Sequence, residues 1–180
     1  MTTATAPRRP RAPRVPQPEI VEMPAQTMAV VSVVGDPNEV SGQVFHALYG
    51  AVYTLKFALK KAGGPEFKVS APRARWPNLP NAPKDEWRAE WGLPIPDGIA
   101  EVPQKVPATP VRVEVWHYGT VAQILHIGTY AEETPNIERL HAFIAEQGYE
   151  IAGDHEEEYL TQPDAKVQKT IIRYPIRKRG

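Results

Sequence analysis

The sequence of 180 residues contains no cysteine and no long apolar run. Without cysteine there is no disulfide framework, no cysteine nucleophile, and no zinc or iron–sulfur site held by thiolates. No apolar stretch approaches the roughly 18 residues of a membrane-spanning helix, and the N-terminal arginines have no apolar segment behind them, so we expect no membrane span and no secretory signal. These absences predict a cytoplasmic protein with one domain and a real core.

The sequence also has no net charge, because its 21 basic and 21 acidic residues balance. The cancellation hides an uneven distribution, since both ends of the chain are basic and residues 131–158 are strongly acidic. Aromatic residues are not interleaved with the basic ones, as a stacking surface for nucleic acid would need. We therefore expect no specific nucleic-acid binding and interpret the basic ends as solubilising.

Proline is abundant, with 20 residues, and is concentrated in two segments. Residues 1–18 combine prolines and arginines with little apolar surface, which predicts a disordered basic tail. Prolines recur from Pro65 to Pro110, and such a density is incompatible with helix interiors and central strands. We therefore expect a long irregular excursion over residues 71–110. Three tryptophans of this segment are expected to anchor it on the core or to line a pocket: Trp76, Trp87 and Trp91.

Two further segments share one pattern of predicted elements. The first, about residues 19–70, has an apolar strand from Met28, a Gly-Asp-Pro-Asn turn, a helix over about 39–62, and the start of a strand at Phe67. The second, about residues 111–177, has a strand up to Gly128 and a helix. This second helix starts with Thr134-Pro135 as N-cap and first residue, and three short strands follow it.

This duplication predicts an α+β fold made of two strand–helix–strand–strand halves. Hairpins outnumber crossovers, so we expect a mainly antiparallel sheet with the helices on one face. A ligand cleft is expected where the two halves meet. Tyr49 and Tyr53 lie four residues apart in the first helix and share a face, so they suit either core packing or a pocket wall.

Three consecutive glutamates lie in a strand predicted over residues 156–160. Alternation places Glu157 and Tyr159 on one face, and Glu156 and Glu158 on the other, where we interpret them as a solvated acidic edge. A carboxylate of Glu157 among aromatic rings would attract a lipophilic cation through its charge and through cation–π contacts. Burial would also raise its pKa, which would suit a general base or acid.

No cofactor or metal is expected. His155 stands beside the three glutamates, but no second histidine lies at a ligand spacing from it. Gly63-Gly64 is followed by proline and lacks the Gly-Lys-Ser/Thr of a phosphate-binding loop. His126, alone in a strand, is interpreted as a packed and hydrogen-bonded residue.

An ordered set of motifs over about residues 19–177 resembles the GyrI-like small-molecule-binding domain family. In the second half these motifs are Gln123-Ile-Leu-His-Ile-Gly-Thr-Tyr, Glu132-Glu-Thr, Leu140-x-x-Phe-Ile, Gly148-Tyr, His155-Glu-Glu-Glu-Tyr-Leu-Thr-Gln-Pro and Lys169-Thr-Ile-Ile-Arg-Tyr-Pro. Motifs of the first half are similar to the freestanding branch of the family: Gly35-Asp-Pro-Asn, Ala47-Leu-Tyr and Tyr53-Thr-Leu-Lys-Phe.

The resemblance implies a pocket between duplicated halves that binds hydrophobic or amphipathic aromatic compounds, often cationic, in sensing or sequestration of drugs and other xenobiotics. The family pattern Glu-x-Tyr-Leu falls on Glu157, Tyr159 and Leu160. We expect the following residues to bind the ligand: Glu157, Tyr159, Tyr53, Tyr49, Trp76, Trp91 and Tyr130.

Two alternatives come with the resemblance. Some freestanding members hydrolyse cyclopropane-bearing cytotoxins, which implies a catalytic Glu157 that positions or activates water. Their acidic residue and paired tryptophan near Trp76 are missing from Ala71-Pro-Arg-Ala-Arg-Trp-Pro, and this favours binding. Other members are effector domains of regulators. The first 18 residues cannot form a helix-turn-helix, so this third interpretation requires a partner protein.

Overall fold

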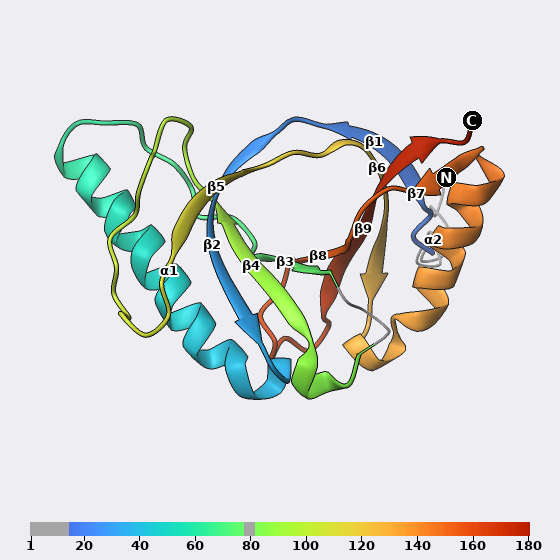
Figure 1. The fold of residues 1–180 in the computed structure, drawn as a ribbon, viewed down its shortest axis with the longest axis horizontal. Coiled ribbons are helices and arrows are strands. Elements are labelled where there is room, and N and C mark those ends of the chain that lie inside the picture. Colours follow the sequence, from blue (N-terminus) through green and yellow to red (C-terminus); the bar gives the residue numbers. More distant parts are fainter. Residues whose placement is uncertain (1–14, 78–81) are drawn as a thin grey trace, which may run out of the picture.

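The structure is a computed structural model that describes residues 15–77 and 82–180. Within them, two α-helices and nine strands form an α+β fold, in which the antiparallel sheet curls into a half-barrel with one helix at each end of the molecule (Figure 1). Neither of these helices combines the length and the apolar character needed to cross a membrane. Residues 1–14 of the predicted tail and residues 78–81 of the predicted excursion lie outside the described part.

The first half follows the predicted order of strand, helix, strand and strand. Its elements are β2 (Gln26–Val34), α1 (Pro37–Lys61), β3 (Arg73–Trp76), the short helix η1 (Lys84–Glu86) and β4 (Arg88–Pro94). Asp36 caps α1 by accepting the backbone N–H of Asn38, and Pro37 fits the first turn. The predicted strand at Phe67 is wrong, because β3 is the segment that pairs with β4 and β8.

The second half adds a further short strand. Its elements are β6 (Gly119–Ile127), the short helix η2 (Tyr130–Glu132), α2 (Thr134–Glu146), β7 (Tyr149–Ile151), β8 (His155–Tyr159) and β9 (Lys169–Lys178). Helix α2 begins at Thr134, so its N-cap is Glu133 and not Thr134 as predicted. This shift of one residue matters, because Glu133 is buried beside the candidate site.

The two ends of the sheet are joined by a continuous ribbon. Strand β1 (Glu19–Met23) pairs with β6, and β2 pairs with β5 (Arg112–Trp116). The register continues from one pair into the other without a shift. Glu19 lies opposite Gln123; seven residues later in the sequence Gln26 lies opposite Trp116, which is seven residues before Gln123. The sheet order β1-β6-β9-β8-β3-β4-β2-β5 therefore starts and ends on this ribbon, which spans the top of Figure 1 and keeps the sheet curled.

The prediction that residues 71–110 are irregular is wrong in part, because β3 and β4 are inner strands of the sheet. The prolines flank these strands and do not interrupt them: Pro72 precedes β3, Pro77 follows it, and Pro94 is the last residue of β4. A proline at a strand end removes only a marginal donor from the ladder. Residues 95–111 do lack helices and strands, as predicted.

Both helices cover the same face of the sheet, as predicted. One row of cross-strand partners on this face contains Val31, Trp91, Ala74, Glu157, Ile172 and Ile124, all of them buried. Helix α1 packs over the first part of this row and α2 over the last part. Glu157 is thus a charged residue at the centre of an apolar row, at the boundary between the two halves.

The opposite face carries an ion ladder. Glu156 accepts hydrogen bonds from Arg75 and Arg173, each at 2.8 Å, and Arg173 also donates to Gln123 at 3.0 Å. Glu158 pairs with the same Arg173 at 3.0 Å. The interpretation of Glu156 and Glu158 as a solvated edge is therefore wrong, because β8 lies inside the sheet between β3 and β9.

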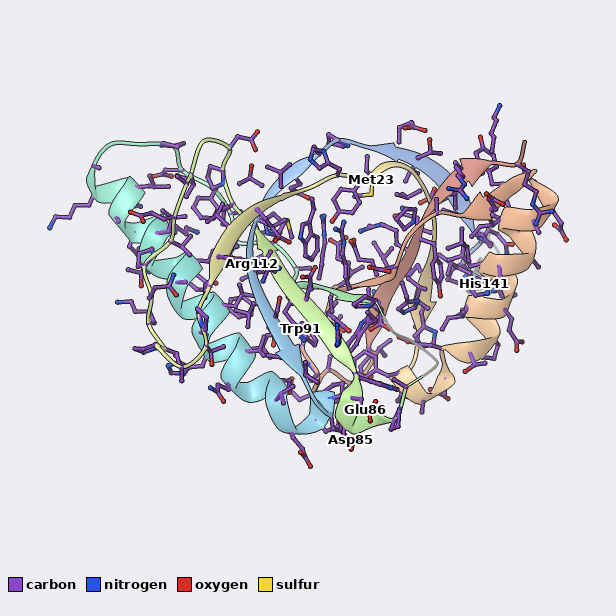
Figure 2. All side chains as sticks on the ribbon, in the orientation of Figure 1. Met23, Asp85, Glu86, Trp91, Arg112 and His141 are labelled. Atoms are coloured by element: carbon purple, nitrogen blue, oxygen red, sulfur yellow. The ribbon has the colours of Figure 1, made fainter. Side chains whose placement is uncertain are left out.

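An apolar cluster covers this ladder from the side of the ribbon. Met28 and Trp116 are its largest fully buried members, and Met23, labelled at the top of Figure 2, packs against it. The guanidinium of Arg75 lies 3.9 Å from the ring centroid of Trp116. Gly92 is required at this contact, since a Cβ there would lie 2.9 Å from atoms of Met28 and Trp116.

Candidate functional site

A cavity of about 1330 Å³ lies between the two halves, on the face that the helices cover. The first half contributes one face of α1, the segment before β3 and the tryptophans of β3 and β4. The second half contributes η2, the end of β8 and the loop after it. Trp91 on β4 marks the wall of the first half in Figure 2. The predicted cleft between the halves is thus present.

All seven residues that the sequence marks as ligand contacts line this cavity, and they come from five elements. They are Tyr49 and Tyr53 of α1, Trp76 of β3, Trp91 of β4, Tyr130 of η2, and Glu157 and Tyr159 of β8. The lining also includes aromatic residues outside that set, Phe45 and Trp87. Phe45 lies four residues before Tyr49 on the same helix face, which is the signal that could have found it.

Trp91 is the centre of the aromatic wall. Its ring stacks on Tyr159 with centroids 5.2 Å apart, and it meets Phe45 and Trp76 edge to face at 4.9 and 5.9 Å. Tyr130 closes the other side of Tyr159 at 5.6 Å. Because these rings belong to both halves, the aromatic wall is continuous across their boundary.

The floor of the cavity holds the carboxylate of Glu157, which is 8% exposed. Tyr159 donates its hydroxyl to Oε2, and His155 Nε2 lies 2.8 Å from Oε1. The other ring nitrogen of His155, Nδ1, lies 2.7 Å from the hydroxyl of Tyr174. Both ring nitrogens of His155 are therefore engaged, Nε2 by Glu157 and Nδ1 by Tyr174.

These contacts decide the charge of Glu157. Burial raises the pKa of its carboxyl, but the hydrogen bond from His155 and that from Tyr159 outweigh burial and lower the pKa below its usual value. Burial does raise this pKa as expected, but the net shift is downward, which the sequence did not predict. Burial and the nearby charge of Glu157 raise the pKa of Tyr159 well above its ordinary value, so this phenol stays neutral.

A second carboxyl group, that of Glu133, lies behind Glu157 and was missed in the sequence. A hydrogen bond joins the two carboxyl groups, and Glu133 is 6% exposed. Burial, followed by the charge of Glu157, raises the pKa of Glu133 to about 9. The pair therefore consists of a neutral Glu133 and an ionised Glu157 at neutral pH.

The described histidines do not form a metal site. Among residues 15–77 and 82–180, no group of three or more His, Asp or Glu side chains is arranged to hold a metal ion. His126 is buried, with Nε2 2.9 Å from the carbonyl of Thr129 and Nδ1 2.9 Å from the amide of Asn136. The interpretation of His126 as a packed, hydrogen-bonded residue is confirmed.

Several solved structures share this fold. An uncharacterized conserved protein from Listeria innocua is 24% identical, with a TM-score of 0.80 over 92% of this chain and 94% of that chain. A hydrolase from Listeria innocua is 22% identical, with a TM-score of 0.77 over the same shares. The EcmrR C-terminal domain is 14% identical, with a TM-score of 0.63 over 92% of this chain and all of that chain. At these identities the likeness shows the fold alone.

None of the curated proteins matches the sequence. The model of one family does match, over residues 16–177, which is nearly the whole chain. The duplicated halves, the curled antiparallel sheet and the cavity between the halves agree with that match. The chain therefore belongs to the GyrI-like small molecule binding domain family.

Proposed function

We propose that the cavity binds hydrophobic or amphipathic aromatic small molecules that carry a positive charge. One observation carries this proposal: the ionised carboxylate of Glu157 lies at the floor of a cavity whose walls are aromatic rings. A buried anion beside ring faces is the arrangement that attracts a lipophilic cation, because charge attraction and cation–π contacts act together.

The hydrogen bonds around Glu157 support the same conclusion. Its partners His155 and Tyr159 hold the carboxylate in place, and no Lys or Arg among the described residues forms an ion pair with it. The desolvated anion is therefore available to a cation that brings its own apolar surface. Trp91, Trp76 and Tyr130 would contact the rings of the ligand, with Tyr49 and Tyr53 at the α1 side.

The volume of the cavity supports a broad range of ligands. Pockets for drug-sized molecules measure roughly 300–1,000 Å³, and this cavity is larger at about 1330 Å³. Molecules of different outline can therefore place a charge near Glu157 and rings along the wall. Such breadth suits the sensing or sequestration of drugs and other xenobiotics in the cytoplasm.

The test is a titration with tetraphenylphosphonium and with a rhodamine dye, set beside a neutral compound of similar shape, triphenylphosphine oxide. We expect the cations to bind at least tenfold more tightly, and Glu157→Gln to weaken their binding by 10- to 100-fold, about 1.4–3 kcal/mol. The exposed Glu138 of α2 provides a matched control, and Glu138→Gln should change nothing. Equal affinity for cation and neutral compound in the native protein would refute the proposal.

Hydrolysis is the second candidate, and the carboxyl pair favours it. Two carboxyl groups whose pKa values are driven apart are typical of acid–base catalysis, and Glu133 and Glu157 form such a pair. In this reaction Glu157 would take a proton from water, which attacks a strained cyclopropane-bearing electrophile. Turnover above the uncatalysed rate, lost in Glu157→Gln, would establish hydrolysis, and its absence would leave binding alone.

A further inference from the structure

Glu133 and Glu157 form a buried pair of carboxyl groups. Glu133 and Glu157 are both buried and hydrogen-bonded to each other, and among the described residues no Lys, Arg or His forms an ion pair with Glu133. The Oε1 atom of Glu133 is buried and receives no hydrogen bond from that part of the chain. Two buried carboxylates in contact cannot both be ionised without a neighbouring positive charge, so the pair keeps one proton.

The groups that face the pair come from each neighbouring element. From β8 these are His155 and Tyr159, from β9 Tyr174, and from η2 Tyr130. The three phenols stay neutral, because burial and the charge of the pair raise their pKa values, that of Tyr174 to about 12. The remaining facing group is His155, whose Nε2 lies 2.8 Å from Oε1 of Glu157.

Glu133 is also the N-cap residue of α2. The backbone N–H groups of Asn136 and Ile137 bond to its backbone carbonyl, and its carboxyl group makes no capping hydrogen bond to the helix. The carboxyl group is therefore left to its contact with Glu157.

We propose that the cavity accepts one positive charge as it stands, and a second positive charge in exchange for the proton of Glu133. Aromatic dications would then be ligands as well as monocations, and the binding of a dication would release one proton. This inference rests on the proposed function, because it takes Glu157 to be the group that attracts the first charge. It adds Glu133 as a residue that determines how much charge the site accepts.

The proton of Glu133 is held at neutral pH but can be exchanged. Burial and the charge of Glu157 raise the pKa of Glu133 to about 9. A dication that displaces this proton must therefore meet the cost of removing it, which reduces its affinity by about 100-fold at pH 7 and about tenfold at pH 8. The affinity for a dication should therefore rise about tenfold per pH unit over this range. The affinity for a monocation should stay level there, because Glu157 is already ionised.

Two permanent cations of nearly the same outline test the exchange: 1-methyl-4-phenylpyridinium, with one charge, and methyl viologen, with two. Titration calorimetry in phosphate and in Tris between pH 6.5 and 8.5 measures both affinity and proton release. We expect methyl viologen to release about one proton and to bind more tightly as pH rises. The monocation should release none. In Glu133→Gln, methyl viologen should lose both effects while the monocation keeps its affinity, and Glu138→Gln should behave as the native protein.

Each outcome decides the inference. If methyl viologen binds with no difference between the buffers, the exchange is refuted and the proposed function stands. If neither cation binds, the proposed function fails together with the inference. Proton release that persists in Glu133→Gln would assign the proton to another group and refute the role of Glu133. Should Glu133→Gln fail to fold, the pH dependence of the native protein with the two cations still decides.

Discussion

Glu156 and Glu157 are neighbours on β8, yet their carboxylates lie on opposite faces of the sheet. Glu156 accepts from Arg75 and Arg173 in the ion ladder, at 2.8 Å each. Glu157 faces the cavity, where His155 and Tyr159 hold it. Since one carboxylate is surrounded by cations and the other by rings, the same substitution at the two positions should have different effects.

Glu156→Gln should destabilise the fold and leave binding intact. Removing one partner of a buried ion pair costs about 3 kcal/mol or more, because the arginines lose their counter-ion. Glu157→Gln should change the free energy of unfolding by less than about 1 kcal/mol, since glutamine still accepts from Tyr159, and should weaken cation binding. Urea unfolding and a tetraphenylphosphonium titration on both variants measure this. A folded Glu156→Gln that lost affinity as Glu157→Gln does would contradict the division between the faces.

The tryptophans divide between the faces in the same way. Trp91 lines the cavity, whereas Trp116 lies in the apolar cluster on the far side, where its Nε1 donates to Glu114 at 2.5 Å. We expect a pyridinium cation, which quenches indole only at contact, to quench Trp91 and spare Trp116. Trp91→Phe should therefore reduce the quenching on titration, and Trp116→Phe should preserve it. The opposite result would place the ligand on the ion-ladder face.

Alternation along β8 was enough to predict that Glu157 and Tyr159 share a face, because the side-chain period of a strand is local. The burial of Glu156 was not predictable in this way. Its partner Arg75 comes from β3, in a segment whose prolines argue against strands, and only the pairing of β3 with β8 brings the two together. The proline density was a correct observation, but the prolines stand at the ends of β3 and β4.

In the candidate site, too, local features were predictable from the sequence and long-range contacts were not. The aromatic lining could be predicted from motifs and helical spacing, which are properties of short segments. Glu133 could not, because its contact with Glu157 depends on how η2 and the start of α2 return to the sheet. No local sequence pattern distinguishes the buried Glu133 from Glu132, the residue before it. Glu132 is exposed, and its carboxylate accepts hydrogen bonds from the backbone N–H and the hydroxyl of Thr129.

His155 should control the acid side of the binding profile. Burial raises the pKa of Glu157, whereas the hydrogen bond and charge of His155 lower it, so a variant without the imidazole should have a higher pKa at Glu157. Cation affinity depends on ionised Glu157 and is lost as pH falls through that pKa. In His155→Ala the loss should therefore begin at a higher pH than in the native protein, and His155→Gln should restore part of the difference. Affinity for tetraphenylphosphonium between pH 4 and 8 is the measurement. Identical profiles would show that His155 does not set the charge of Glu157.

Glu133→Gln should stabilise the free protein, and more so as pH rises. The pKa of Glu133 is raised from 4.5 to about 9 in the fold, so between these values the folded state binds one more proton than the unfolded state. The stability of the native protein then decreases with pH, by up to about 1.4 kcal/mol per unit for this proton. Glutamine carries no such proton, and its advantage at pH 7 should reach about 3.5 kcal/mol.

Urea unfolding at pH 5, 7 and 9 follows this difference, with Glu138→Gln as the control for a glutamate on the exposed side of α2. The gap between Glu133→Gln and the native protein should be small at pH 5 and widest near pH 9, where the folded native protein also begins to lose the proton. A gap that stays constant across this range would mean that Glu133 ionises as an ordinary glutamate. The pair would then hold no proton, and the charge of the cavity floor would be fixed.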